Sequence, residues 1–382
     1  MEKIIYLDNA ATTFVDESIV KQINIFFTGK FGNASSQHSK GLEAKRALEE
    51  SRKIIAKSIN AKTEEIIFTS GGTESNNLAL KGIILANPDK KHIITTKIEH
   101  DCILNACRWM EKNLGVDVTY LDVDNEGFVN PDDVRKAIRP DTAIVSIIHG
   151  NNEIGTIQDL EKIGKICREK GVYFHSDACQ SYTKTIINVK KQNLDLLTLN
   201  SHKIHGPKGV GALYIRHGIK VTPLMHGGNH ENGLRSGTEN VSGIVGFAEA
   251  VKLAKEKHTK EMQNLRDYFI EGLLKISNTK LNGPRKNRLC NNINICFEGL
   301  DGESIGGYLD SYGVCTSVGS ACSSRLHEPS HVLLAIGRSP KEASASIRFS
   351  LSRYNKKEEI DYVLEILPKI INKINKINRW FK

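Results

Sequence analysis

Segments typical of strands and helices alternate along the chain between about residue 41 and residue 255. Short apolar runs such as 66–69 and 92–95 are separated by stretches in which apolar residues recur at helical spacing, such as 101–113. This alternation predicts an α/β domain with a mainly parallel central sheet covered by helices on both faces. Ligands of such sheets bind beyond the carboxyl ends of the strands, so polar residues at those ends are candidate site residues.

The individual elements can be assigned along the chain. The predicted strands are 66–69, 92–95, 116–121, 143–148, 172–175, 194–199 and 210–215, and the predicted helices between them are 74–86, 101–113, 131–138 and 159–170. A helix-rich stretch at 241–277 is followed by short strands at 292–297 and 345–350 and by a helix at 356–373. These later segments predict a second, smaller α+β lobe. Glycine- and serine-rich segments predict loops at 29–41, 226–243 and 313–324.

The composition narrows the class of protein. No apolar run reaches the length of about 18 residues that a membrane span needs, so no membrane association is predicted. The N-terminus lacks the apolar core and cleavage site of a secretory signal, which favours the cytoplasm. The eight cysteines include no CxxC pair, so neither a structural metal site nor a disulfide framework is indicated.

The net charge of +9 could suggest nucleic-acid binding, but Lys and Arg are spread over the whole chain and concentrate only at 369–382. In and just before this segment Ile366, Ile370, Ile374 and Ile377 recur at helical spacing. The stripe favours an amphipathic helix docked on the body of the protein, because an arm that binds nucleic acid has no need of it. No nucleic-acid partner is therefore predicted.

The stretch 194–208 places a lysine just beyond the end of a predicted buried strand. The apolar run stops at Asn200, and Lys203 follows three residues later. Lysine is strongly hydrated and seldom fully buried unless it is paired. An amine in a half-buried cleft can form a Schiff base with an aldehyde cofactor. The alternative is an ordinary lysine with a buried stem and its ammonium in water.

Other strand ends carry side chains that complement such a cofactor. Asp177 could pair with a protonated pyridine nitrogen, and Gln180 could donate a hydrogen bond to a ring oxygen. The imidazole of His100 could stack on a flat ring and move protons near neutral pH. Each of these could instead be a satisfied polar residue at a strand end. Together they match what pyridoxal phosphate requires.

Residues 69–77 follow a predicted strand and open a predicted helix. The backbone N–H groups of this turn, with the hydroxyls of Thr73 and Ser75, could bind an anion such as a phosphate. The segment is neither a Walker motif nor GxGxxG, so it does not imply a nucleotide. An ordinary capped turn is the alternative.

Two residues of the smaller lobe suggest substrate chemistry. Arg348 lies in a strand-like segment, where an inward guanidinium suits the carboxylate of an amino acid, or else an ion pair with an internal acid. Cys322 lies in a loop of small residues with no apolar pattern around it. An accessible thiol there suggests a nucleophile.

Motifs spread over nearly the whole chain resemble those of the cysteine desulfurases of the NifS/IscS type, within the class V aminotransferase superfamily. They are Tyr6-Leu-Asp-Asn-Ala-Ala-Thr-Thr, Gly32-Asn-Ala-Ser-Ser-Gln-His, Ser70-Gly-Gly-Thr-Glu-Ser-Asn-Asn, Asn151-Asn-Glu-Ile-Gly-Thr, His202-Lys-Ile-His-Gly-Pro-Lys-Gly, Arg235-Ser-Gly-Thr-Glu-Asn, Ser320-Ala-Cys-Ser-Ser and Arg348-Phe-Ser-Leu-Ser-Arg. The resemblance implies the type I fold of pyridoxal-phosphate-dependent transferases. It implies a large cofactor-binding domain at 14–255 and a small domain at 1–13 and 256–382 that carries the cysteine loop.

The resemblance also implies a role for each site residue. Lys203 would bind pyridoxal 5′-phosphate covalently, Asp177 would face the pyridine nitrogen, and Cys322 would accept the sulfur of L-cysteine as a persulfide. His100 would stack on the ring, and Arg348 with Asn152 would receive the substrate carboxylate. The other implied cofactor contacts are Gly72, Thr73, Asn152, Gln180, Asn200, Ser201, His202 and, from the second subunit of a homodimer, Thr238. The sulfur would pass to an acceptor such as an iron–sulfur scaffold protein.

One departure from the family pattern concerns the phosphate. The family usually has Ser or Thr where this chain has Asn200. Asn can also donate a hydrogen bond and Ser201 is adjacent, so we expect the cofactor to be retained with altered phosphate contacts. A selenocysteine lyase or a related class V enzyme is the alternative activity, and Cys322 disfavours a plain transaminase.

Overall fold

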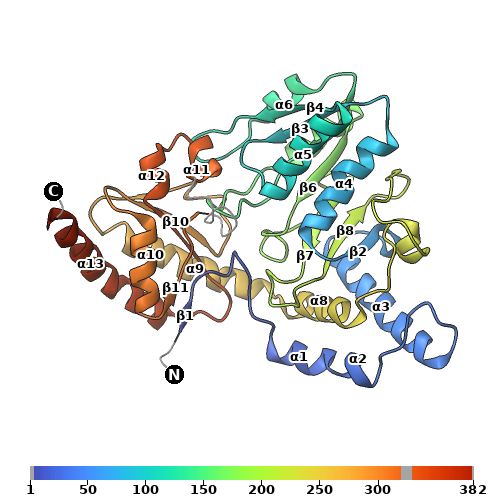
Figure 1. Cartoon of the computed structure of the whole chain (residues 1–382), viewed down its shortest axis with the longest axis horizontal. Coiled ribbons are helices and arrows are strands. Elements are labelled where there is room, and N and C mark those ends of the chain that lie inside the picture. Colours follow the sequence, from blue (N-terminus) through green and yellow to red (C-terminus); the bar gives the residue numbers. More distant parts are fainter. Residues whose placement is uncertain (1–3, 320–328, 381–382) are drawn as a thin grey trace.

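The computed structural model describes residues 4–319 and 329–380, with only the backbone described for 378–380. The chain forms two lobes, and Figure 1 shows the larger one with the central sheet on the right and the smaller one on the left. Both ends of the chain lie on the smaller lobe (Figure 1). No helix in the described ranges is both long enough and apolar enough to cross a membrane.

The larger lobe is built on a seven-stranded sheet. In spatial order its strands are β2 (Ile66–Thr69), β8 (Gly211–Ile215), β7 (Leu196–Asn200), β6 (Tyr173–Asp177), β5 (Thr142–Ser146), β3 (His92–Thr96) and β4 (Asp117–Leu121). Neighbours from β7 to β4 pair in parallel, and β8 is antiparallel to both β2 and β7. The predicted mainly parallel sheet is confirmed, and every predicted strand of this region is present within two residues of its expected ends.

Helices cover both faces of this sheet. The larger lobe contains α1 (Glu17–Ile23), α2 (Ile25–Thr28), α3 (Ser39–Ser58), α4 (Gly72–Ala86), α5 (Asp101–Leu114), α6 (Pro131–Ala137), α7 (Leu160–Lys170) and α8 (Val241–Leu253), with short 3-10 turns at Thr63–Glu65 and His230–Gly233. Local chemistry sets their ends. Asp159 caps α7 by accepting from the Lys162 N–H, and Gly171 ends the helix in the left-handed region at φ 67°.

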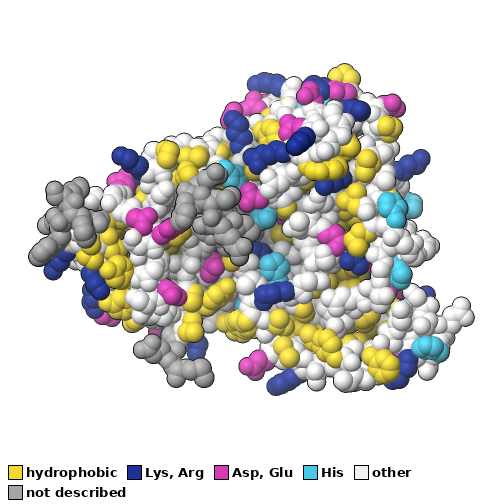
Figure 2. Space-filling model, viewed as in Figure 1, with side chains coloured by type: hydrophobic (Ala, Val, Ile, Leu, Met, Phe, Trp, Pro, Cys, Tyr) yellow, Lys and Arg dark blue, Asp and Glu magenta, His cyan; other side chains and the backbone are white. Residues whose placement is uncertain are grey.

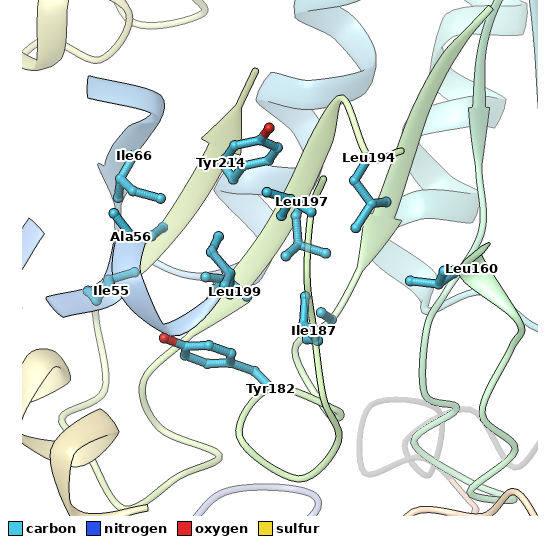
Figure 3. Packing of buried hydrophobic residues seen from close by; sticks show 14 of the residues in the cluster. Ile55, Ala56, Ile66, Leu160, Tyr182, Ile187, Leu194, Leu197, Leu199 and Tyr214 are labelled. Atoms are coloured by element: carbon cyan, nitrogen blue, oxygen red, sulfur yellow. The ribbon is translucent and has the colours of Figure 1, made fainter. Parts of the chain in front are cut away.

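Successive residues of the central strands supply two different cores. Leu197 and Leu199 of β7 pack with residues of α3, α7 and α8, and Leu196 packs with residues of α4 and α5. Figure 3 shows Leu197 and Leu199 beside Ile55, Ile66 and Tyr214 on the first of these faces. Each fully buried Leu or Ile stabilises the fold by about 1.5–3 kcal/mol. Because both faces are apolar, the strand ends are where polar side chains can gather.

The smaller lobe has its own sheet and core. A three-stranded antiparallel sheet runs β12 (Ser346–Ser350), β10 (Asn292–Phe297) and β9 (Thr279–Leu281), while β1 (Ile5–Tyr6) pairs in parallel with β11 (Val314–Cys315). Its helices are α9 (Glu256–Leu273), α10 (Gly302–Ser311), α11 (His331–Ala335), α12 (Pro340–Ser344) and α13 (Lys357–Trp380). A separate apolar cluster joins β1, the sheet, α9, α10 and α13. On this basis we propose the domain boundaries expected from sequence, 14–255 against 1–13 with 256–382.

Several sequence predictions need correction. The helix-rich stretch 241–277 is two helices, α8 and α9, and the predicted loop 29–41 already contains the start of α3 at Ser39. Position 41, in the first turn of α3, requires glycine, because a Cβ there would come within 2.2 Å of the Ser36 carbonyl oxygen. Of the isoleucine stripe on α13, Ile366, Ile370 and Ile374 are buried as predicted, but Ile377 is 40% exposed.

Candidate active site

A pocket of about 240 Å³ lies where β6 and β7 end and where α4 and α5 begin. It is lined by Ala11, Gly72, Thr73, Asn76, His100, Cys102, Ile148, Asn152, Asp177, Cys179, Gln180, Asn200, His202 and Lys203. The fold therefore brings most of the predicted site residues to one place, at the carboxyl ends of parallel strands. Figure 2 shows histidine and Lys or Arg side chains at the surface where the two lobes meet.

Lys203 lies in the turn that follows β7. Its Nζ donates to the carbonyl oxygen of Ala11 at 2.9 Å and also to that of Ala10, both in the segment that follows β1. Burial lowers the pKa of Lys203 to about 8, and the nearby Arg348 guanidinium acts in the same direction. At pH 7 roughly a tenth of this amine is therefore unprotonated and nucleophilic, far more than for an ordinary lysine.

Asp177, the last residue of β6, is 5% exposed. Its Oδ2 accepts from Asn76 Nδ2 at 2.7 Å, and its Oδ1 accepts from the Cys179 N–H at 2.8 Å. In the described part of the chain it forms no ion pair with Lys or Arg. Its two hydrogen-bond donors, an amide and a backbone N–H, are both neutral. A protonated ring nitrogen in the pocket would supply the missing cation.

The turn before α4 is shaped for close approach of an anion. At Gly72 a Cβ would lie 2.6 Å from Cys179 Sγ, so only glycine fits there. Gly72 and Thr73, which line the pocket, are the first two residues of α4, and the backbone N–H groups of a helix N-terminus have no partner within the helix. Nearby, Asn200 Oδ1 and Ser201 Oγ are buried without a hydrogen-bond partner. Asn200 Oδ1 only accepts, so the atom of this residue that could bind a phosphate is Nδ2, which would lie 3.9 Å from a Cβ at Gly72.

One prediction about this turn is wrong. The Ser75 hydroxyl shares a hydrogen bond of 2.8 Å with Thr69 Oγ1 and is fully buried, so it faces the sheet rather than the pocket. The helical period explains this, because Ser75 lies on the side of α4 that packs on β2. Thr73 does line the pocket. Ser201 is adjacent to Asn200 but is not among the residues that line the pocket.

Gln180 and the two histidines are held by specific partners. Gln180 Nε2 donates to the carbonyl oxygen of Ala10 at 2.8 Å, the same oxygen that accepts from Lys203. His202 Nδ1 lies 3.1 Å from Thr12 Oγ1, and burial, followed by the charge of Lys203, lowers its pKa to about 3. Burial also lowers the pKa of His100. Both imidazoles are therefore neutral in this pocket near neutral pH.

Arg348 lies on β12 and is 1% exposed. Its Nη2 donates to Asp8 Oδ1 at 2.9 Å and its Nη1 donates to the Asn152 carbonyl oxygen at 3.1 Å, whereas its buried Nε has no partner. The ion pair with an internal acid, the alternative considered from sequence, is thus present. Arg348 does not line the 240 Å³ pocket, although it contacts Asn152, which does.

Two further predicted site residues are not among the described residues that line the pocket. Thr238 is exposed, outside the pocket, in the segment between the 3-10 turn His230–Gly233 and α8. Cys322 falls within 320–328, outside the described residues. The structure therefore places Thr238 outside the pocket of its own chain, and the role of Cys322 stays a prediction.

Five of the residues that line the pocket are not predicted site residues; two of them, Ala11 and Ile148, are apolar, and three carry amide or thiol groups. These three are Asn76, Cys102 and Cys179. A usable signal existed for Asn76, because it lies four and three residues after Gly72 and Thr73 on the same side of α4. Cys179 lies between Asp177 and Gln180, and Cys102 lies two residues after His100, but a cysteine in a neutral environment carries no sequence signal of its own.

Comparison with known proteins is consistent with this geometry. The model of the class-V aminotransferase family matches residues 5–363. The cysteine desulfurase IscS of Dictyoglomus turgidum is 51% identical over 99% of this chain and 97% of its own length. The cysteine desulfurase IscS of Methanosarcina thermophila is 49% identical over 98% of this chain and 94% of its own length.

Solved structures agree in the fold. A NifS-like protein superposes with a TM-score of 0.91 at 37% identity, covering 97% of this chain and all of its own (100%). A structure of SspA in complex with cysteine superposes with a TM-score of 0.83 at 38% identity, covering 92% of this chain and 100% of its own. The chain belongs to the class-V aminotransferase family. Within that family it belongs to the cysteine desulfurases, and its cofactor is pyridoxal 5′-phosphate.

Proposed function

We propose that this protein converts L-cysteine to L-alanine and stores the sulfur as a persulfide on Cys322. The observation that carries the proposal is one pocket that holds a nucleophilic amine, Lys203, opposite a buried carboxylate, Asp177, that lacks a cation. Asn200 Nδ2 lies beside Gly72 at the start of α4, where it and the free N–H groups of the helix could donate to a phosphate. No simpler ligand uses all of these groups.

The cofactor, when bound, supplies an aldehyde for the substrate amine and a ring that stabilises negative charge at the substrate carbon. Asp177 would favour the protonated ring nitrogen, and neutral His100 would lie against the ring face. Gly72, Thr73, Asn200 and His202, which line the pocket, would surround the phosphate, and Ser201 would support Asn200 from outside the lining. Arg348 with Asn152 would orient the substrate carboxylate, which requires Asp8 to share the guanidinium.

Proton movement falls to Lys203. With a pKa of about 8, its amine can accept the α-proton of cysteine and return a proton later. The Cys322 thiolate attacks the substrate sulfur, so an S–S bond forms as the Cβ–S bond breaks. A proton then replaces sulfur on Cβ, which gives alanine. The sum is L-cysteine plus a thiol giving L-alanine plus a persulfide, with no external oxidant.

The test compares Cys322→Ala with the wild type and with Cys315→Ala. Cys315 is a partly exposed thiol of β11, earlier in the same part of the chain, and serves as a matched control. Alanine formed from L-cysteine under a reductant should fall to background in the first variant and persist in the second. Undiminished alanine formation in Cys322→Ala would contradict the role of Cys322.

A selenocysteine lyase is the second candidate activity. The solved relative in complex with cysteine favours cysteine as the substrate class. Comparing kcat/KM for L-cysteine and L-selenocysteine in Cys322→Ala separates the two, because selenium release without a protein thiol would persist in a lyase. Loss of both activities supports the desulfurase.

We also propose a homodimer that works in the cytoplasm and passes sulfur to an acceptor or iron–sulfur scaffold protein. Large apolar side chains are exposed on the N-terminal segment, namely Phe14, Ile25, Phe27, Phe31 and Leu42. Figure 2 shows apolar side chains along the lower edge of the larger lobe, where α1 and α2 run in Figure 1. Exposed patches of this kind mark interfaces. In such a dimer the exposed Thr238 would contribute to the pocket of the second subunit. Sedimentation of the Phe27→Glu variant tests the dimer, because a charge in this apolar patch should shift the protein toward the monomer.

A further inference from the structure

A continuous chain of hydrogen bonds joins Asp177 to His100. Asn76 Nδ2 donates to Asp177 Oδ2 at 2.7 Å and to Cys102 Sγ at 3.2 Å. Cys102 Sγ in turn lies 3.1 Å from His100 Nδ1, and the backbone N–H of Cys102 donates to the same nitrogen at 3.2 Å. All four side chains line the 240 Å³ pocket and come from α4, α5 with its N-cap, and β6.

The chemistry of the partners fixes the direction of each hydrogen bond. A carboxylate only accepts, so the NH₂ group of Asn76, and not its oxygen, must face Asp177. The second hydrogen of that NH₂ group is then available to Cys102 Sγ. Burial, followed by the charge of Asp177, raises the pKa of Cys102 to about 12, so this thiol keeps its proton near neutral pH. The Thr73 hydroxyl also hydrogen-bonds to Cys102 and lowers this pKa, as a donor to the sulfur does, so the S–H is left to donate to His100 Nδ1.

His100 Nδ1 therefore faces two donors, the S–H and the N–H of Cys102, and carries no proton of its own. The proton of the neutral imidazole lies on Nε2. The charged groups that act on this ring are Asp177, Lys203, Asp101 and Glu153. Burial and Lys203 favour the neutral ring, whereas Asp177, Asp101 and Glu153 favour the protonated ring. A hydrogen bond from the Cys102 thiol to Nδ1 therefore favours the neutral ring, together with burial and Lys203.

We propose that Cys102 and Asn76 are positioning residues that keep His100 neutral, with its proton on Nε2, beside the cofactor ring. The proposal rests on the proposed function only for the role of His100. A protonated His100 would compete with the ring nitrogen for Asp177 and would remove the charge imbalance that favours the cofactor. The thiol opposes this protonation. In an imidazolium the Nδ1–H of His100 would face two other donors, the S–H and the backbone N–H of Cys102.

The experiment is an NMR titration of histidine side chains labelled with ¹⁵N, which reports pKa and tautomer for each ring without requiring turnover. His100→Gln assigns the resonance. In Cys102→Ala the pKa of His100 should rise by about 0.5–1 unit, the size expected from loss of one hydrogen bond to the neutral form. Cys102→Ser keeps a donor at the same place and should restore the wild-type value. Cys107→Ala, a buried thiol of the same helix packed among apolar side chains, should leave it unchanged.

A second measurement covers a variant that does not fold. Where circular dichroism shows Cys102→Ala to be unfolded, Asn76→Ala decides, because it releases the thiol and should also raise the pKa of His100. An unchanged pKa and tautomer in the folded variant overturns the proposal, as does a Cys102→Ser protein that titrates like Cys102→Ala. A protein that titrates as expected but forms no alanine from L-cysteine would refute the proposed function instead.

Discussion

Lys203 lines both the active-site pocket and a second, smaller cavity, whereas Lys184 lines only the second, and the two lysines differ in surroundings but not in acidity. Burial lowers the pKa of Lys203 and of Lys184 alike to about 8. Lys184 Nζ donates to the carbonyl oxygens of Gln180 and Lys203, in a cavity of only about 40 Å³. No carboxylate is among the described residues that line that cavity, whereas Lys203 shares its pocket with Asp177. A lowered pKa therefore does not by itself identify a reactive lysine, because the facing groups decide what it can bind.

The largest expected effect separates the two lysines. Lys203→Ala should lower alanine formation from L-cysteine by about 10²–10⁴-fold, because it removes the group that moves the α-proton. The loss should appear in kcat measured at saturating cofactor. Full activity in this variant would contradict the assignment of Lys203. Lys203→Arg is the matched variant, since it keeps the charge but not the nucleophile.

Removal of Lys184 should act on the fold more than on the chemistry. Lys184→Met leaves two buried carbonyl oxygens without their donor and should lower the free energy of unfolding by about 1–3 kcal/mol. Urea denaturation measures this loss. Alanine formation should fall by less than in Lys203→Ala. A loss of activity as large as that of Lys203→Ala, in a folded protein, would remove the distinction between the two lysines.

The pH dependence of cofactor uptake sharpens the same comparison. The amine of Lys203 must be unprotonated to attack an aldehyde, so the rate at which apoprotein takes up pyridoxal phosphate should rise with pH to a plateau, with a midpoint near pH 8. The charge of Lys184 contributes to lowering the pKa of Lys203. In Lys184→Met the midpoint should therefore move to higher pH, which stopped-flow absorbance can follow. A midpoint that stays in place would show that Lys184 does not influence Lys203.

The smallest expected effect concerns Asn200. Asn200→Ala should weaken cofactor binding several-fold, about the value of one hydrogen bond, without changing the wavelength of the bound cofactor. Asn200→Ser restores the residue type usual in the family and should bind at least as tightly as the wild type. Equilibrium dialysis of the three proteins measures the difference. Equal affinity in all three would exclude Asn200 from the phosphate site.

The contrast between Ser75 and Asn76 shows where prediction from sequence stops. Both lie in the motif that opens α4, but the hydroxyl of Ser75 bonds to Thr69 and only Asn76 reaches Asp177. Polar type and helical spacing alone do not separate these neighbours, because the outcome depends on how α4 is rotated on the sheet. For Arg348 the sequence left two partners open, and the observed partner, Asp8, is distant in the chain and was not foreseen.

Local sequence patterns are enough to predict the alternating α/β lobe, the smaller lobe and the positions of Lys203, Asp177 and His100 at strand ends, because apolar periodicity and breaks in it are local properties. Only the tertiary structure shows that Cys102 contacts His100, that Lys203 shares a pocket with Asp177, and which buried polar atoms have no partner. These features depend on how the segments pack against one another, as in the contacts of Ala10 with Gln180 and Lys203, which are far from it in sequence.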